Sequence, residues 1–278
     1  MKVAFHTLGC KVNQYETESM RQQFVKEGFE AVGEEDFADV YIINTCTVTN
    51  LADRKSRQYI RRMKKGNPDA IIAVTGYYAQ IKPEEIEALP EVDIVADTGE
   101  KNNLLGYVKE FMEKKAPQTH IKAYEELCEY QDKGIITSME SRTRAYIKIQ
   151  EGCDRFCSYC LIPFARGKVR SRNPEEVIEE ARTLIEKGFK EIILTGINTA
   201  LYGTEEGFSE KYPSWVAEEG IESIIKAICQ IEGNFRIRLS SLEPAVINAE
   251  YVRRLMKYDM ISYVSTCTFP HRAEATIC

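Results

Sequence analysis

The chain has 278 residues and a formal net charge of −6, from 37 Lys and Arg against 43 Asp and Glu. Hydrophobic residues make up 44% of it, which is ordinary for a globular protein. No apolar run approaches the roughly 20 residues that cross a bilayer, and no secretory signal opens the chain, so we expect a cytoplasmic protein with no membrane partner. The acidic balance argues against indiscriminate nucleic-acid binding, although the basic run 54–65 is compatible with local RNA contacts.

Residues 1–115 alternate apolar runs with helical patterns. The apolar runs predict strands at 2–9, 39–46, 70–76 and 92–99. Helices are expected between and after them at 16–27, 52–65, 83–89 and 103–113. This cadence is typical of a parallel sheet covered on both faces, so we expect an α/β domain of flavodoxin-like or Rossmann-like form. No GxGxxG follows the first strand, and a dinucleotide site is therefore poorly supported.

Two cysteines follow strands of this domain. Cys10 ends the first strand and Cys46 ends the second. Residues at the carboxyl ends of neighbouring parallel strands can converge on one site. Free cysteines are also common as small buried hydrophobic residues, so the two residues by themselves leave both interpretations open.

A second domain is expected after a charged linker at 116–141. The region 142–265 predicts strands at 146–150, 191–198 and 235–244, with helices at 174–187 and 221–231. This β/α alternation favours the early units of a partial (β/α) barrel.

Three cysteines lie within eight residues directly after the first of these strands. Cys153, Cys157 and Cys160 form a CxxxCxxC run in EGCDRFCSYC, a spacing that suits three corners of an iron–sulfur cube and leaves one iron open. A structural zinc site would pair its cysteines and need a fourth ligand, yet the only histidines of the chain are His6, His120 and His271. A disulfide framework does not suit a protein without a secretory signal.

The run resembles that of the radical S-adenosylmethionine enzymes, which carry CxxxCxxC with an aromatic residue before the last cysteine, here Tyr159. The resemblance implies a four-iron four-sulfur cluster on the three thiolates and S-adenosylmethionine on the open iron, cleaved reductively to a 5'-deoxyadenosyl radical. It also implies cofactor contacts from Tyr159 and from two strand ends. These are Thr195, Gly196 and Asn198 in LTGIN, and Ser240, Ser241 and Glu243 in RLSSLEP. Ordinary strand-end turns are the alternative for both segments.

Residues 1–260 are similar to the methylthiotransferases of that superfamily. The similarity lies in TLGCKVNQYETE, NTCTVTNLADRKSRQ and VTGYYAQ, and it is greatest to the branch that converts threonylcarbamoyladenosine in tRNA to its 2-methylthio form. It implies a tRNA anticodon loop as substrate and an electron donor such as flavodoxin. One S-adenosylmethionine would methylate a sulfur of a second, auxiliary cluster. Another would supply the radical that abstracts a hydrogen from adenine C2 before methylthio transfer.

In that family three cysteines of the N-terminal domain hold the auxiliary cluster, and two of them match Cys10 and Cys46. At the place of the third this chain has Tyr77, in VTGYYAQ. A phenolate is a harder ligand than a thiolate, so the second cluster is in doubt unless Tyr77, Cys128 or another group completes the set.

Two further segments bear on function. In the basic run ARGKVRSR, residues Arg166, Lys168 and Arg170 are candidates for phosphate or cofactor contact, or belong to a solvated face. At the C-terminus, TCTFPHRAEATIC replaces the HLHxPLQSGSD pattern of the family. A back-translation read one nucleotide earlier restores a similar pattern, so we expect a frameshift near Ser265, an aberrant tail at 266–278 and no ligand role for its cysteines.

An early end to the barrel predicts weak or no turnover by this polypeptide alone. The two alternatives to a tRNA methylthiotransferase are a radical S-adenosylmethionine enzyme of another reaction type and a non-catalytic remnant that binds RNA or nothing.

Overall fold

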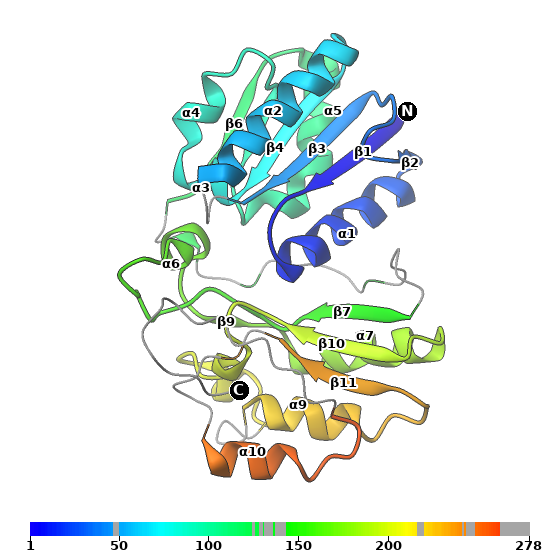
Figure 1. Ribbon diagram of the computed structural model, residues 1–278, viewed down its shortest axis with the longest axis vertical. Coiled ribbons are helices and arrows are strands. Elements are labelled where there is room, and N and C mark those ends of the chain that lie inside the picture. Colours follow the sequence, from blue (N-terminus) through cyan, green and yellow to red (C-terminus); the bar gives the residue numbers. More distant parts are fainter. Residues whose placement is uncertain are drawn as a thin grey trace. The chain divides into compact units, whose positions relative to one another are not determined.

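The computed structural model describes residues 1–46, 50–123, 126–127, 130, 136, 143–215, 220–240, 242 and 248–261 (Figure 1). The predicted roles of Cys128, Ser241 and Glu243 and the predicted aberrant tail concern residues outside these ranges. The chain divides into two compact units. The first comprises 1–136 with 160–168, and the second comprises 137–159 with 169–278.

The first unit is built on a six-stranded sheet in which every pair of neighbouring strands is parallel, in the order β2-β1-β3-β4-β5-β6. Its strands are β1 (Lys2–Thr7), β2 (Glu30–Val32), β3 (Val40–Thr45), β4 (Ile71–Gly76), β5 (Ile94–Ala96) and β6 (Gln118–His120). The order 2-1-3-4-5 is that of flavodoxin-like folds. The expected α/β architecture is therefore confirmed, and of its two forms the structure has the flavodoxin-like one.

Helices cover both faces of this sheet. They are α1 (Lys11–Lys26), α2 (Asn50–Gly66), α3 (Tyr77–Ile81), α4 (Pro83–Glu87) and α5 (Leu104–Lys114). Neighbouring strand residues point to opposite faces: Ile42 packs in one apolar cluster with α1 and α5, and Ile43 in another with α2 and α3. Because both clusters are buried, the central strands are buried along their whole length and mostly apolar, as the sequence predicted.

The second unit contains a three-stranded parallel sheet in the order β11-β10-β7 and an antiparallel pair, β8-β9. These strands are β7 (Arg144–Lys148), β8 (Gln150–Glu151), β9 (Arg170–Ser171), β10 (Glu191–Thr195) and β11 (Arg236–Leu239). The helices of this unit are α7 (Pro174–Glu186), α8 (Phe208–Lys211), α9 (Ile221–Ile228) and α10 (Ala249–Leu255).

Helices α7 and α9 pack on the sheet of the second unit through one continuous apolar cluster, which includes Ala181, Leu184, Ile224 and Ile228. Helix α7 begins where its sequence predicted, because the Asn173 side chain accepts a hydrogen bond from the backbone N–H of Glu175 and Pro174 opens the helix. Parallel strands with helical crossovers match the expected early units of a (β/α) barrel.

Candidate functional site

In the first unit the carboxyl ends of β1, β3 and β4 lead into Cys10, Cys46 and Tyr77. Cys10 is exposed at the start of α1, and Cys46 is buried. The preceding Gly9 has a φ of +112°, and a Cβ placed on it would lie 2.9 Å from Cys46 Cβ and 3.2 Å from Cys46 Sγ. The turn that carries Cys10 therefore packs directly against Cys46, and only glycine fits at its centre.

The side chain of Asn13 fastens these two strand ends to each other. Its Nδ2 donates hydrogen bonds to the carbonyl oxygens of Leu8 (2.8 Å) and Thr45 (3.1 Å). In return, Asn44 Nδ2 donates to the carbonyl oxygen of Asn13 at 3.0 Å. The structure thus brings the chain around the two cysteines together at the edge of the sheet where flavodoxin-like folds bind their ligands.

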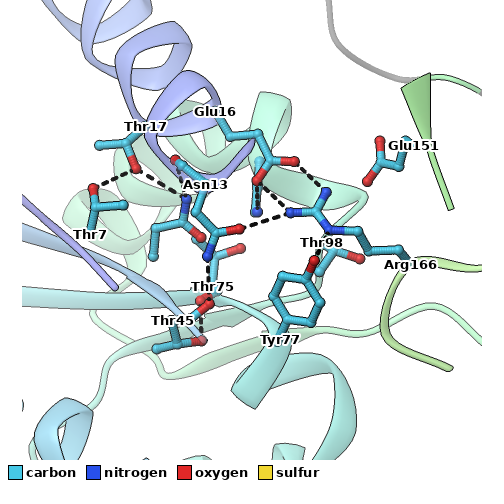
Figure 2. Close-up of polar contacts among 12 residues, drawn as sticks. Thr7, Asn13, Glu16, Thr17, Thr45, Thr75, Tyr77, Thr98, Glu151 and Arg166 are labelled. Atoms are coloured by element: carbon cyan, nitrogen blue, oxygen red, sulfur yellow. Dashed lines mark hydrogen bonds and ion pairs between the residues drawn. The ribbon is translucent and has the colours of Figure 1, made fainter. Parts of the chain in front are cut away.

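Tyr77 begins α3 and belongs to a buried polar network (Figure 2). Its hydroxyl accepts a hydrogen bond from Arg166 Nε at 2.6 Å. The other two guanidinium nitrogens of Arg166 bind Glu16, and Nη2 also donates to Asn13 Oδ1 at 2.9 Å. Glu16 in turn forms an ion pair with Lys101. Arg166, Glu16 and Tyr77 are each at most 2% exposed, so this network is shielded from water.

Tyr77 is neutral within this network of charged side chains. Burial raises the pKa of its phenol well above the ordinary value, an effect that Arg166 opposes only in part. Arg166 lies in α6 (Ile162–Arg166), inside the basic run ARGKVRSR. The prediction of a solvated or phosphate-binding side chain is therefore wrong for Arg166, and Arg170 is also buried; only Lys168 of the three is exposed.

A second iron–sulfur cluster does not fit the residues at this edge of the first sheet. Among the described residues the donor set is two thiols and one neutral phenol whose oxygen is already bound by a guanidinium group. Four-iron clusters in proteins need thiolate ligands, and two are too few. We therefore derive no chemical step from a second cluster.

The CxxxCxxC loop starts from a well-anchored base in the second unit. Gln150 Nε2 donates hydrogen bonds to the carbonyl oxygens of Glu151 (2.7 Å) and Gly152 (2.8 Å). Glu151 also forms a buried ion pair with Lys148 at 2.8 Å. Sequence reasoning missed both Lys148 and Gln150, although the alternation in YIKIQEG places these two polar residues on one face of an otherwise apolar strand.

Within this loop Cys153, Cys157 and Cys160 are partly exposed and form no disulfide. Phe156 and Tyr159 between them are about half exposed, at 49% and 48%. Three reduced thiols on one short loop are the donor set that a four-iron cluster takes. In the described ranges no three His, Cys, Asp or Glu side chains are grouped tightly enough to hold a metal. The three thiols therefore match a four-iron cluster in the type and number of their donor atoms.

The strand ends predicted to contact the cofactor lie in the second unit. Gln150 Oε1 accepts hydrogen bonds from the backbone N–H groups of Ile197 (3.0 Å) and Asn198 (2.9 Å). A Cβ on Gly196 would lie 3.0 Å from both the carbonyl oxygen and Oε1 of Gln150. The absence of a side chain at Gly196 therefore makes room for Gln150. Asn198 caps the short 3₁₀ turn Thr199–Leu201. Ser240 is buried, and its carbonyl oxygen accepts a hydrogen bond from Thr199 Oγ1 at 2.9 Å.

Thr195 is the predicted cofactor residue with a free hydrogen-bonding group. Its Oγ1 is buried and has no hydrogen-bond partner within the described part of the chain. A buried hydroxyl without a partner is costly, and a polar ligand at the carboxyl end of β10 would satisfy it. The Thr195 hydroxyl is thus, among the described residues, the one predicted cofactor-binding group at this strand end without a hydrogen-bond partner.

Glu100, which follows the carboxyl end of β5, gives the first unit a testable acid dependence. Burial alone would raise its pKa, but hydrogen bonds from Asn103, Lys122 and Tyr107 outweigh burial and lower the pKa to about 2. A depressed carboxyl pKa stabilises the fold above the unfolded value of 4.5, and that stabilisation is lost as the pH falls toward 2. We expect Glu100→Gln to reduce stability at neutral pH and to flatten the loss between pH 4.5 and 2, as measured by urea unfolding.

Glu110→Gln is the matched control, because the pair of Glu110 with Lys114 is exposed. It should leave the pH dependence nearly as it was. An unchanged acid limb in Glu100→Gln would contradict the assignment.

Comparison with known proteins identifies both units. Residues 2–97 match the uncharacterized protein family UPF0004, and residues 147–266 match the radical SAM superfamily. The chain is 46% identical over 266 residues to the threonylcarbamoyladenosine tRNA methylthiotransferase MtaB of Bacillus subtilis (strain 168), which covers 93% of this chain and 55% of that protein. It is 38% identical to the MtaB protein of Aquifex aeolicus (strain VF5), covering 94% of this chain and 61% of that one. The chain thus spans little more than half the length of these relatives.

A solved structure agrees on the fold. The radical S-adenosylmethionine methyltransferase TsrM from Kitasatospora setae, with cobalamin and a [4Fe-4S] cluster bound, superposes with a TM-score of 0.57 at 12% identity, covering 91% of this chain and 58% of that one. No helix within the described ranges has the length and hydrophobicity to span a membrane. From the two matched domains and the identity to the tRNA-modifying relatives, the chain belongs to the methylthiotransferase family of the radical S-adenosylmethionine superfamily.

Proposed function

We propose that this chain is part of an enzyme that uses S-adenosylmethionine to modify tRNA, by 2-methylthiolation of the N6-threonylcarbamoyladenosine next to the anticodon. The observation that carries the proposal is the loop of Cys153, Cys157 and Cys160, which follows the parallel strand β7 in a chain 46% identical to an enzyme named for this tRNA substrate. Active sites of barrel enzymes lie at the carboxyl ends of such strands.

The three thiolates of this loop would hold a four-iron cluster, with S-adenosylmethionine beside it. When bound, the cluster supplies the electron that cleaves the sulfonium. The roles left to the chain are to position the cofactor and to keep water away. We assign positioning to the free hydroxyl of Thr195, to the Gly196–Asn198 turn fixed by Gln150, and to Ser240. Tyr159, Ser241 and Glu243 are assigned to the cofactor from their sequence positions.

Recognition of an anticodon loop requires contacts to phosphates and a base turned out of its stack. Helix α2 offers a basic surface for the phosphates, since the side chains of Arg54, Lys55 and Lys65 are exposed. Lys168 adds an exposed cation shortly after the cysteine loop. These residues, and not Arg166, are the ones we assign to RNA contact.

Mass spectrometry of tRNA nucleosides tests the proposed function. Deleting the gene should remove 2-methylthio-N6-threonylcarbamoyladenosine and raise its precursor, and the gene supplied on a plasmid should restore the product. Complementation with Cys157→Ala, which removes one thiol of the loop, should fail. An unchanged nucleoside profile after deletion would refute the tRNA assignment.

One observation favours a second candidate, a radical S-adenosylmethionine enzyme of another reaction type that works with one cluster. The observation is Tyr77, a neutral buried phenol where the resemblance leads one to expect a thiol. The nucleoside profile separates the two candidates, because deleting the gene of an enzyme with another reaction type would leave 2-methylthio-N6-threonylcarbamoyladenosine in tRNA unchanged.

A further inference from the structure

We propose that the first unit of this chain holds no iron–sulfur cluster, because Tyr77, Arg166 and Glu16 have closed the carboxyl end of its sheet with a buried ion network. The inference rests on the proposed function only for the expectation that a second cluster belongs here. On this inference the polypeptide binds one cluster, on Cys153, Cys157 and Cys160. The two thiols of the first unit, Cys10 and Cys46, bind none.

The position of Tyr77 decides which donor atoms reach this edge of the sheet. It follows the carboxyl end of β4, which pairs with β3, the strand that ends before Cys46. Cys10 belongs to the same edge, because Gly9 before it packs against Cys46. The phenol oxygen, however, lies several bonds further from the backbone than a cysteine sulfur would, and it accepts a hydrogen bond from Arg166.

The phenol oxygen is held in that direction by a cation. Arg166 Nε donates to it at 2.6 Å, and the Arg166 Cζ atom lies 4.7 Å from the centre of the tyrosine ring. To ligate iron, this oxygen would have to lose its proton and the contact with Arg166 in a site from which water is excluded. Both changes are costly for a buried group.

The network also leaves no donor atom waiting for a ligand. Among the described residues, no side-chain nitrogen or oxygen of Tyr77, Arg166, Glu16 or Lys101 is buried without a hydrogen-bond partner. A site prepared for a ligand usually keeps such an atom, as Thr195 does at the end of β10. The polar side chains of this network are therefore satisfied by one another, without an added ligand.

The decisive experiment is the iron and sulfide content of the full chain after anaerobic reconstitution. We expect about four irons per chain, unchanged by Cys10→Ala. Tyr77→Cys should raise the content about twofold, to about eight irons, and adding Cys10→Ala to that variant should return it to about four. Tyr77→Phe removes the hydroxyl without supplying a thiol and should stay at about four.

Two results would overturn the inference. One is about eight irons in the unchanged chain with a loss of about four on Cys10→Ala; the other is a folded Tyr77→Cys variant that stays at about four irons. If Tyr77→Cys does not fold, the comparison of the unchanged chain with Cys10→Ala decides alone. Failure of the proposed function would give a different result. If Cys157→Ala removed no iron from the reconstituted chain, the cysteine loop itself would hold no cluster.

Discussion

Cys157→Ala should lose nearly all of the iron that the reconstituted chain binds and, with it, the reductive cleavage of S-adenosylmethionine. Cys157 is the central thiol of a loop that supplies the only three-cysteine run of the sequence. Removing a residue that only hydrogen-bonds to a metal ligand commonly lowers metal affinity 10–100-fold. Losing a ligand itself should therefore reduce cleavage by at least ~100-fold. The measurements are iron per chain and 5'-deoxyadenosine formed after chemical reduction.

Cys229→Ala is the matched control for this loss. Cys229 follows α9, is partly buried, and packs against the apolar cluster of the second unit, where burial raises the pKa of its thiol. Because a buried thiol in apolar surroundings is a poor metal ligand, this variant should keep its iron and its cleavage activity. If Cys157→Ala retained half of the iron, a second cluster elsewhere would be indicated, and the single-cluster inference would be wrong.

Glu16→Gln should be the most destabilising single change in the first unit. Its carboxylate, 2% exposed, is an anion that Arg166 and Lys101 share, and glutamine would remove that negative charge from beside two buried cations. Breaking a buried ion pair from one side costs about 3–5 kcal/mol. The midpoint of urea unfolding should fall accordingly, with the slope of the transition unchanged.

Two comparisons sharpen this prediction. Arg166→Met should cost less than Glu16→Gln, because Glu16 keeps Lys101 as its partner. Glu27→Gln, which removes an exposed pair with Lys109 just after the same helix, should hardly move the midpoint. Equal midpoints for Glu16→Gln and Glu27→Gln would show that the buried network contributes nothing to stability.

The sequence predicted the long elements and missed several of the short ones. The central strands and α2, α5 and α7 were expected within a few residues of where they lie, because apolar periodicity records which face of an element is buried. Strands β2 and β6 have three residues each, and they are extended because they pair with a neighbouring strand of the folded sheet. Helix α1 starts five residues before its predicted beginning, because its first turns bury the polar residues Asn13 and Glu16 and so interrupt the apolar pattern.

By itself the sequence determined the α/β class and the loop of three thiols, since periodicity and ligand spacing are local properties of the chain. The resemblance to a known family marked Tyr77 as standing where a cysteine is expected. Only the tertiary structure decided what Tyr77 does. It binds an arginine 89 residues away, and that arginine binds a glutamate 150 residues away. Whether a charged side chain faces water or a buried partner depends on groups that meet only when the chain folds, so a basic run that suggested phosphate binding also supplies the cation that closes the first sheet.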